Sequence, residues 1–213
     1  MMSGKLALFA FALLLPGADF QLGSALRRVE ARYNNIRTLQ IDYRQEFSYS
    51  TQPSAKRVEK GVLSLQRPGR MRWEYRDPAN KLFLSDGKDV YFYSPSSNRV
   101  ERSKLKETED MRVPLAFLIG RLDFDRDFRE FRIRPVGSDH WIEATPKSPK
   151  APYRQVDFLL TSNFQITRLR VYGQDQSVMD YTFSNERLNP PLDPKLFQFQ
   201  TPAGAQVVDL DNP

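Results

Sequence analysis

Residues 59–75 read EKGVLSLQRPGRMRWEY and carry the clearest strand pattern in this chain of 213 residues. In the second half of the stretch, Met71, Trp73 and Tyr75 alternate with charged residues. A period of two is typical of a strand that buries one face, so the pattern predicts a strand here. The apolar run from Val62 to Leu65 predicts a second strand just before it.

The same period continues on both sides. Residues 81–84 and 90–93 are apolar runs separated by Ser85-Asp86-Gly87-Lys88. An Asp-Gly pair between two such runs predicts a β-hairpin in which both turn residues adopt a positive φ. Further strands are predicted from Leu39 onward and at residues 131–136, 141–145, 155–160, 165–172, 177–185 and 197–200. Turn residues recur at short intervals without a βαβ rhythm, which favours a mainly β (α+β) fold with a curled antiparallel sheet.

Two helices are expected beside the sheet. Apolar residues recur at steps of three and four before the first strand, and Ser24 precedes most of them, so we expect an amphipathic helix over residues 24–36 with Ser24 as N-cap. Pro114, the apolar residues 115–119 and Gly120 predict a short second helix. The apolar positions of the first helix are Leu22, Leu26, Val29, Tyr33 and Ile36.

The first residues have the pattern of an export signal. Lys5 supplies a positive charge, residues 6–15 form an unbroken apolar run, and Pro16-Gly17-Ala18 ends it. The pattern predicts a signal peptide over residues 1–18, followed by one domain over residues 19–213. An uncleaved anchor is the alternative, and either form delivers the remainder across a membrane.

The composition excludes several classes of enzyme. With no cysteine and one histidine, the chain lacks the ligands for thiolate catalysis, iron–sulfur clusters and multi-histidine zinc sites. His140 would have to serve any Ser-His-Asp hydrolase, but no Gly-x-Ser-x-Gly elbow is present, so we expect an exposed turn residue. Asp123, Asp125 and Asp127 alternate as in a calcium loop without its glycine or closing glutamate, so we expect surface ion pairs instead. We therefore expect no enzyme activity, no metal and no cofactor.

The formal net charge of +6 comes from scattered basic residues. A nucleic-acid-binding protein would gather such residues on one face, so we expect no nucleic-acid partner. Most of them are expected on the solvated faces of strands. Steering toward an acidic protein or an anionic lipid is the alternative.

Several segments of the chain together form a recognisable series. They are residues 59–75, Pro78, 84–88 and 91–95, flanked by 39–45 on one side and by 114–119, 197–204 and 207–209 on the other. With the Arg-Pro at 67–68, Trp73 and the Ser-Asp-Gly-Lys series, these segments resemble the LolA family of periplasmic outer-membrane lipoprotein carriers. The resemblance extends over most of the mature chain.

The resemblance implies an unclosed antiparallel β-barrel whose concave apolar face is covered by helices. It implies a monomeric carrier that takes acylated lipoproteins from an ATP-driven inner-membrane complex to an outer-membrane acceptor or membrane. Arg67 takes the place of the family's lid-gating arginine, which holds the empty cavity shut. The residues expected to line the acyl-chain cavity are Tyr33, Leu63, Leu65, Met71, Trp73, Leu84, Phe92, Leu115 and Leu118.

Two other interpretations remain open from the sequence. A related unclosed barrel could carry another lipid or glycolipid, or sense misplaced lipoprotein in the envelope. An envelope binding or structural module would have no lipid cavity, and its apolar strand faces would be plain core. Helices packed directly into the sheet, with no void beneath them, would favour the second interpretation.

Overall fold

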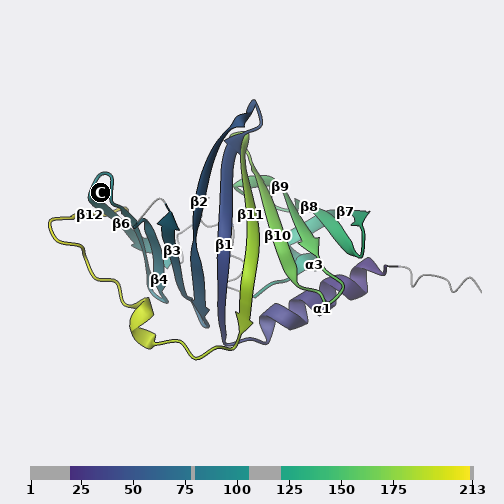
Figure 1. Ribbon diagram of the computed structural model, residues 1–213, viewed down its shortest axis with the longest axis horizontal. Coiled ribbons are helices and arrows are strands. Elements are labelled where there is room, and N and C mark those ends of the chain that lie inside the picture. Colours follow the sequence, from purple (N-terminus) through teal and green to yellow (C-terminus); the bar gives the residue numbers. More distant parts are fainter. Residues whose placement is uncertain (1–19, 78–79, 106–120, 212–213) are drawn as a thin grey trace, which may run out of the picture.

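The computed structural model describes residues 20–77, 80–105 and 121–211, which form one curled sheet of 12 strands with α1 against one side (Figure 1). The order of the strands across the sheet is β12-β6-β5-β4-β3-β2-β1-β11-β10-β9-β8-β7. Neighbouring strands are antiparallel, except that β12 runs parallel to β6. In the described chain the two edge strands, β7 and β12, do not pair with each other, so the barrel is unclosed.

The strands account for most of the described residues. The elements are α1 (Leu22–Asn34), β1 (Thr38–Tyr49), β2 (Gln52–Gln66), β3 (Arg70–Asp77), β4 (Leu82–Asp86), β5 (Asp89–Ser94), β6 (Arg99–Lys104), α3 (Phe124–Asp127), β7 (Phe128–Val136), β8 (Asp139–Pro146), β9 (Tyr153–Leu160), β10 (Ile166–Gly173), β11 (Ser177–Leu188), the 3₁₀ helix η2 (Pro194–Phe197) and β12 (Gln206–Asp209). The predicted mainly β fold with an unclosed antiparallel barrel is confirmed.

Alternation along the strands gives the sheet two different faces. The side that packs against α1, called the concave face below, is apolar at Leu39, Ile41 and Tyr43 of β1, all of them buried. The opposite, convex face is mostly charged and carries ion pairs, such as those from Arg168 and Arg170 to Asp180. The main hydrophobic core therefore lies between the sheet and α1.

The helix α1 begins at Leu22, two residues earlier than predicted, and the prediction of Ser24 as its N-cap is wrong. The N-cap is Gln21, whose side chain makes no capping hydrogen bond. Ser24 lies inside the first turn. Packing of one apolar face, which buries Ala25, Leu26 and others, fixes this helix in place of a side-chain cap.

The predicted hairpin at Asp86-Gly87 is present between β4 and β5, but its turn differs. Gly87 has a φ of 98°, whereas Asp86 still belongs to β4. The Asp86 carboxylate accepts hydrogen bonds from the backbone N–H of Lys88 and Asp89, both at 2.8 Å. A side-chain acceptor therefore closes this turn without a second residue of positive φ.

The predicted strand at 197–200 is wrong. Asp193 caps the 3₁₀ helix η2 by accepting from the Lys195 N–H at 2.9 Å, and the chain joins the sheet only at β12, beside β6. The sequence analysis also missed β6, whose residues are mostly polar. Residues 1–18 and the second helix expected at 115–119 lie outside the described residues.

The predicted place of His140 is wrong as well. It belongs to β8, is half-buried, and its ring stacks on Phe20 with 3.9 Å between ring centroids. Of the aspartates before β7, Asp127 makes the expected surface ion pair, whereas Asp123 is a helix cap. Asp123 caps α3 by accepting from the Arg126 N–H at 2.9 Å, and Arg126 pairs with Asp127 at 2.7 Å.

Candidate concave lipid-binding face

Two rows of apolar side chains cross the middle of the concave face. Strand register aligns Ile41, Leu63, Trp73, Phe83 and Phe92 from β1 to β5. Phe92 is half-buried at the end of this row, and the other four side chains are buried. The adjacent row holds Leu39, Leu65 and Met71.

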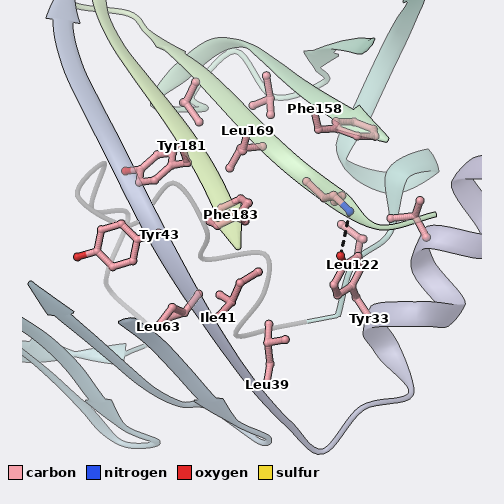
Figure 2. Close-up of a cluster of buried hydrophobic side chains, with 14 of the residues drawn as sticks. Tyr33, Leu39, Ile41, Tyr43, Leu63, Leu122, Phe158, Leu169, Tyr181 and Phe183 are labelled. Carbon is pink, nitrogen blue, oxygen red and sulfur yellow. Dashed lines mark hydrogen bonds between the residues drawn. The ribbon is translucent and has the colours of Figure 1, made fainter. Parts of the chain in front are cut away.

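The structure thus brings together most of the residues predicted to line the cavity. Leu63, Leu65, Met71, Trp73 and Phe92 share the concave face, and Tyr33 of α1 belongs to the same buried cluster. Figure 2 shows Leu39, Ile41 and Leu63 facing the same space as the rings of Tyr43, Tyr181 and Phe183. Leu115 and Leu118 lie outside the described residues.

Leu84 is the exception, and its place in the cavity is corrected. It pairs with Arg72 and Tyr91, whereas its neighbour Phe83 pairs with Trp73, so Leu84 points to the convex face. There it is fully buried, and η2, which carries the buried Phe197, packs against β3 and β4. Phe83 occupies the concave position that the sequence analysis gave to Leu84.

Tyr33 fixes α1 to the sheet through its hydroxyl. The hydroxyl accepts from the buried Ile166 N–H at 3.0 Å, the dashed line at Tyr33 in Figure 2. It donates to Glu186 Oε2 at 2.8 Å. Arg32 forms an ion pair with the same Glu186 carboxylate. Burial, together with the Glu186 charge, raises the pKa of Tyr33 above its ordinary value, so the hydroxyl stays protonated.

Arg67 lies between β2 and β3 and reaches back to α1. Its Nη2 donates to the carbonyl oxygen of Tyr33 at 3.0 Å, and its backbone N–H donates to the Arg37 carbonyl at 2.9 Å. Burial lowers the pKa of the Arg67 guanidinium. The residue predicted to gate the cavity therefore ties the β2–β3 turn to the last turn of α1.

A groove of about 700 Å³ lies beside the Arg67 turn. Arg70 and Lys88 give it a basic lining, and Pro194 and Phe197 of η2 also contribute to it. Arg67 is therefore placed between the end of α1 and an open basic groove.

Toward the β1–β2 hairpin, aromatic side chains replace aliphatic ones on the concave face. Tyr43, Trp73, Tyr75 and Tyr181 form an aromatic cluster there, with 5.0 Å between the ring centroids of Tyr43 and Trp73 and 5.6 Å between those of Trp73 and Tyr181. Burial raises the pKa of all three tyrosines. Gly61 makes room for this cluster, because a Cβ atom there would lie 2.7 Å from the Tyr43 hydroxyl and 1.8 Å from the Glu74 carbonyl oxygen.

Polar side chains follow the aromatic cluster on the same face. Gln45 of β1 pairs with Glu59 of β2 and with Tyr181 of β11, and all three side chains are buried. Glu59 forms an ion pair with Lys81, whose ammonium lies 4.3 Å from the centre of the Tyr75 ring. The concave face therefore carries a polar row at Gln45 and Glu59, and the apolar pair Phe47 and Met179 follows it.

The family model described as outer membrane lipoprotein carrier protein LolA matches residues 34–200. The chain belongs to the LolA family. Similar proteins named outer-membrane lipoprotein carrier protein include one from Nitrosospira multiformis, 28% identical over 97% of this chain and 98% of its own. Another, from Methylococcus capsulatus, is 30% identical over 85% of this chain and 86% of its own.

A solved structure shares the LolA-family fold at low sequence identity. It is an uncharacterized conserved protein from Thermus thermophilus, with a TM-score of 0.51 and 13% identity. The match covers 88% of this chain and 98% of the other. Among the residues described here, no helix has both the length and the apolarity to cross a membrane.

The sequence analysis missed several residues of this concave face and its contacts with α1. Phe83 had the required apolar character, but its face depended on the register between β3 and β4. Glu186 carried no signal, because it approaches Tyr33 through an irregularity in the β1–β11 pairing, where Asn185 has a φ of 53°. Gln45 could have been found from the alternation of β1, since it continues the buried series of Leu39, Ile41 and Tyr43.

Proposed function

We propose that this protein is a periplasmic carrier that binds the acyl chains of lipoproteins on its concave face and moves them from the inner to the outer membrane. The observation that supports this most strongly is the continuous buried apolar surface from Leu39 to Phe92 in an unclosed sheet of the LolA family. Residues 1–18 would direct export, and residues 19–213 would form the carrier domain.

An apolar surface of this kind lowers the free-energy barrier to moving acyl chains through water. A multiply acylated anchor exposes on the order of 30 methylenes, each worth about 0.8 kcal/mol when buried, so transfer through water without a carrier is very slow. A carrier supplies apolar surface in place of the membrane. Its hold has to stay below the practical limit of roughly −20 kcal/mol for non-covalent binding, because the cargo must leave again.

The partners follow from the direction of transfer. Cargo would arrive from an ATP-driven complex of the inner membrane and would leave for an outer-membrane acceptor or for the membrane itself. Arg67 would act as the gate. Its hydrogen bond to Tyr33 stabilises the packed, cargo-free arrangement of α1, and a hydrogen bond worth about 1 kcal/mol net can be broken during loading and remade during release.

Native mass spectrometry with lipid extraction tests the cargo. The mature chain is purified from a host that makes lipoproteins, and a bound lipoprotein or its acylated fragment is expected. Trp73→Asp should abolish binding. Phe92→Asp is a second variant, and because Phe92 is only half-buried at the end of the row, the fold should tolerate the introduced carboxylate better there. Val58→Asp on the exposed part of β2 is the matched control and should keep the cargo. Circular dichroism establishes that each variant is folded.

A protein that copurifies with no lipid, and that takes up no lipoprotein from membranes bearing the transporter, would contradict the proposal. A bound glycolipid in place of a lipoprotein would point to a different cargo on the same face.

A further inference from the structure

Gln45 is a buried polar side chain without an evident structural role. It is 6% exposed, and its amide oxygen Oε1 receives no hydrogen bond from any described residue. Buried polar atoms in folded proteins nearly always have a partner, so an unpartnered carbonyl oxygen on a buried face needs an explanation.

The cross-strand neighbours of Gln45 do not donate to its amide oxygen, since the Glu59 carboxylate has no hydrogen to donate and the Tyr181 hydroxyl is directed elsewhere. Glu59, directly opposite on β2, pairs with Lys81, and Arg57 Nε lies 3.6 Å from the same carboxylate oxygen. The hydroxyl of Tyr181, the partner on β11, is directed to Met179 Sδ at 3.6 Å. An acceptor is therefore left over in the row that crosses β11, β1 and β2.

Burial of an unpaired amide oxygen makes Gln45 destabilising in the ligand-free protein. An apolar side chain of similar length would fill the site without burying an unpaired amide, so Gln45 lowers the stability of the empty carrier. Such a cost is understandable when a ligand supplies the missing donor. Gln45 also interrupts the apolar concave side of β1 between Tyr43 and Phe47, four residues from Ile41 or about 13 Å at 3.3 Å per residue.

We infer that Gln45 Oε1 accepts a hydrogen bond from the amide N–H of an acyl group that is joined to its head group through nitrogen. The inference rests on the proposed function, since it places the acyl chain along the apolar rows and its linkage at Gln45. An ester linkage has no donor and cannot make this bond, whereas an amide linkage has one N–H. Gln45 is then a specificity-determining residue that favours an amide over an ester linkage of the acyl chain at this position.

Two matched synthetic lipopeptides test the inference. They differ only in one linkage, an amide in the first and the isosteric ester in the second, and their affinities are measured by competition with a fluorescent fatty acid. The wild-type protein should bind the amide about fivefold or more tightly, as expected for one net hydrogen bond within a buried site.

Gln45→Met should remove that preference and bind the ester as tightly as the wild-type protein does. The same variant, freed of its unpaired amide, should raise the Tm of the ligand-free protein by about 2–4 °C. Gln40→Met is the matched control. Gln40 lies on the same strand but on the convex face, where its side chain bonds Ser64 at 3.1 Å and Arg187. Gln40→Met should therefore keep the preference for the amide-linked lipopeptide and should not raise the Tm of the ligand-free protein.

The outcomes separate this inference from the proposed function. Equal affinity of the wild-type protein for amide and ester, or an undiminished preference in Gln45→Met, would overturn the role of Gln45 while the carrier function stands. Failure of the wild-type protein to bind either lipopeptide or the fatty acid would overturn the carrier function and the inference together. The comparison of the two ligands on wild-type protein needs no variant, and Gln45→Leu replaces Gln45→Met should the latter not fold.

Discussion

The Tyr33 hydroxyl connects α1 to two strands through a single oxygen atom. It is the acceptor for the buried Ile166 N–H and a donor to Glu186. Tyr33→Phe would leave the Ile166 N–H without a partner in a buried place. The expected loss is about 1–3 kcal/mol in the free energy of unfolding, the cost of an unsatisfied buried donor. Urea denaturation measures this loss.

Tyr93→Phe is the control for this change. Its hydroxyl donates to Asn98 Oδ1 at 3.1 Å in a half-buried hairpin, where water can replace the bond. A loss well under 1 kcal/mol is expected there. Equal losses in both variants would show that the connection between α1 and the sheet does not depend on the Tyr33 hydroxyl.

Substitution of Arg67 should change the rate of cargo release rather than the free energy of unfolding. Arg67→Leu removes the hydrogen bond to the Tyr33 carbonyl, which favours the cargo-free arrangement, so the variant should fold and load cargo but release it several-fold more slowly. Transfer of an acylated lipopeptide from the carrier to acceptor vesicles, followed by fluorescence, measures the rate.

Arg70→Leu on the same turn is the matched control and should release at the wild-type rate, since Arg70 is exposed and bonds only Gln66 in the described structure. Wild-type release by Arg67→Leu would refute the gating role.

At the scale of elements, the β1–β2 hairpin is joined on its convex side by Glu46. Its carboxylate pairs with Lys56 of β2 at 2.7 Å and with Arg44 of β1. The hydrogen bonds from Lys56 and then Arg44 lower the pKa of Glu46 from 4.5 to about 2. Because this pKa is lower in the folded chain, the stabilisation by Glu46 is complete above pH 4.5 and is lost as the pH falls toward 2.

Glu46→Gln should therefore be less stable than the wild-type protein at pH 7, and the difference should shrink as the pH falls from 4.5 to 2. The free energy of unfolding at several pH values measures it. The pairs are partly exposed, so the difference at pH 7 should also shrink in high salt. A difference that is constant from pH 7 to 2 would contradict this account.

Sequence periodicity predicted the strands well where only the concave face is buried, as in the alternation of Met71, Trp73 and Tyr75. It failed where a distant segment covers the other face. Leu84 and Phe83 are both apolar neighbours, and only the return of η2 over a hundred residues later explains why both are buried. The same limit applies to Glu186, because its approach to Tyr33 depends on the pairing of β11 with β1, which is distant in sequence.

At the scale of the whole molecule, the concave face is closed in the described structure. Leu63, Leu65 and Met71 are 0% exposed, and α1 belongs to the same buried cluster. Acyl chains need contact with these side chains, and interiors this closely packed do not admit added groups without movement. Loading therefore requires that some element move away from the sheet. Polar contacts of α1 with the sheet and the β2–β3 turn come from Tyr33, Arg32 and Arg67. Asn34 and Glu30 bond the backbone of residues 122 and 124, which precede β7.

We therefore expect α1 to move away from the sheet when cargo binds. The chain contains no cysteine, so spin labels can be attached at two introduced ones, Ala31→Cys on the exposed side of α1 and Thr182→Cys on the exposed convex side of β11. Pulsed electron paramagnetic resonance should give a longer or broader distance distribution with an acylated lipopeptide than without it. The pair Val58→Cys and Thr182→Cys lies within the sheet and should give the same distance in both states. An unchanged distance from α1 to β11 at saturating lipopeptide would mean that cargo reaches the concave face with α1 in place.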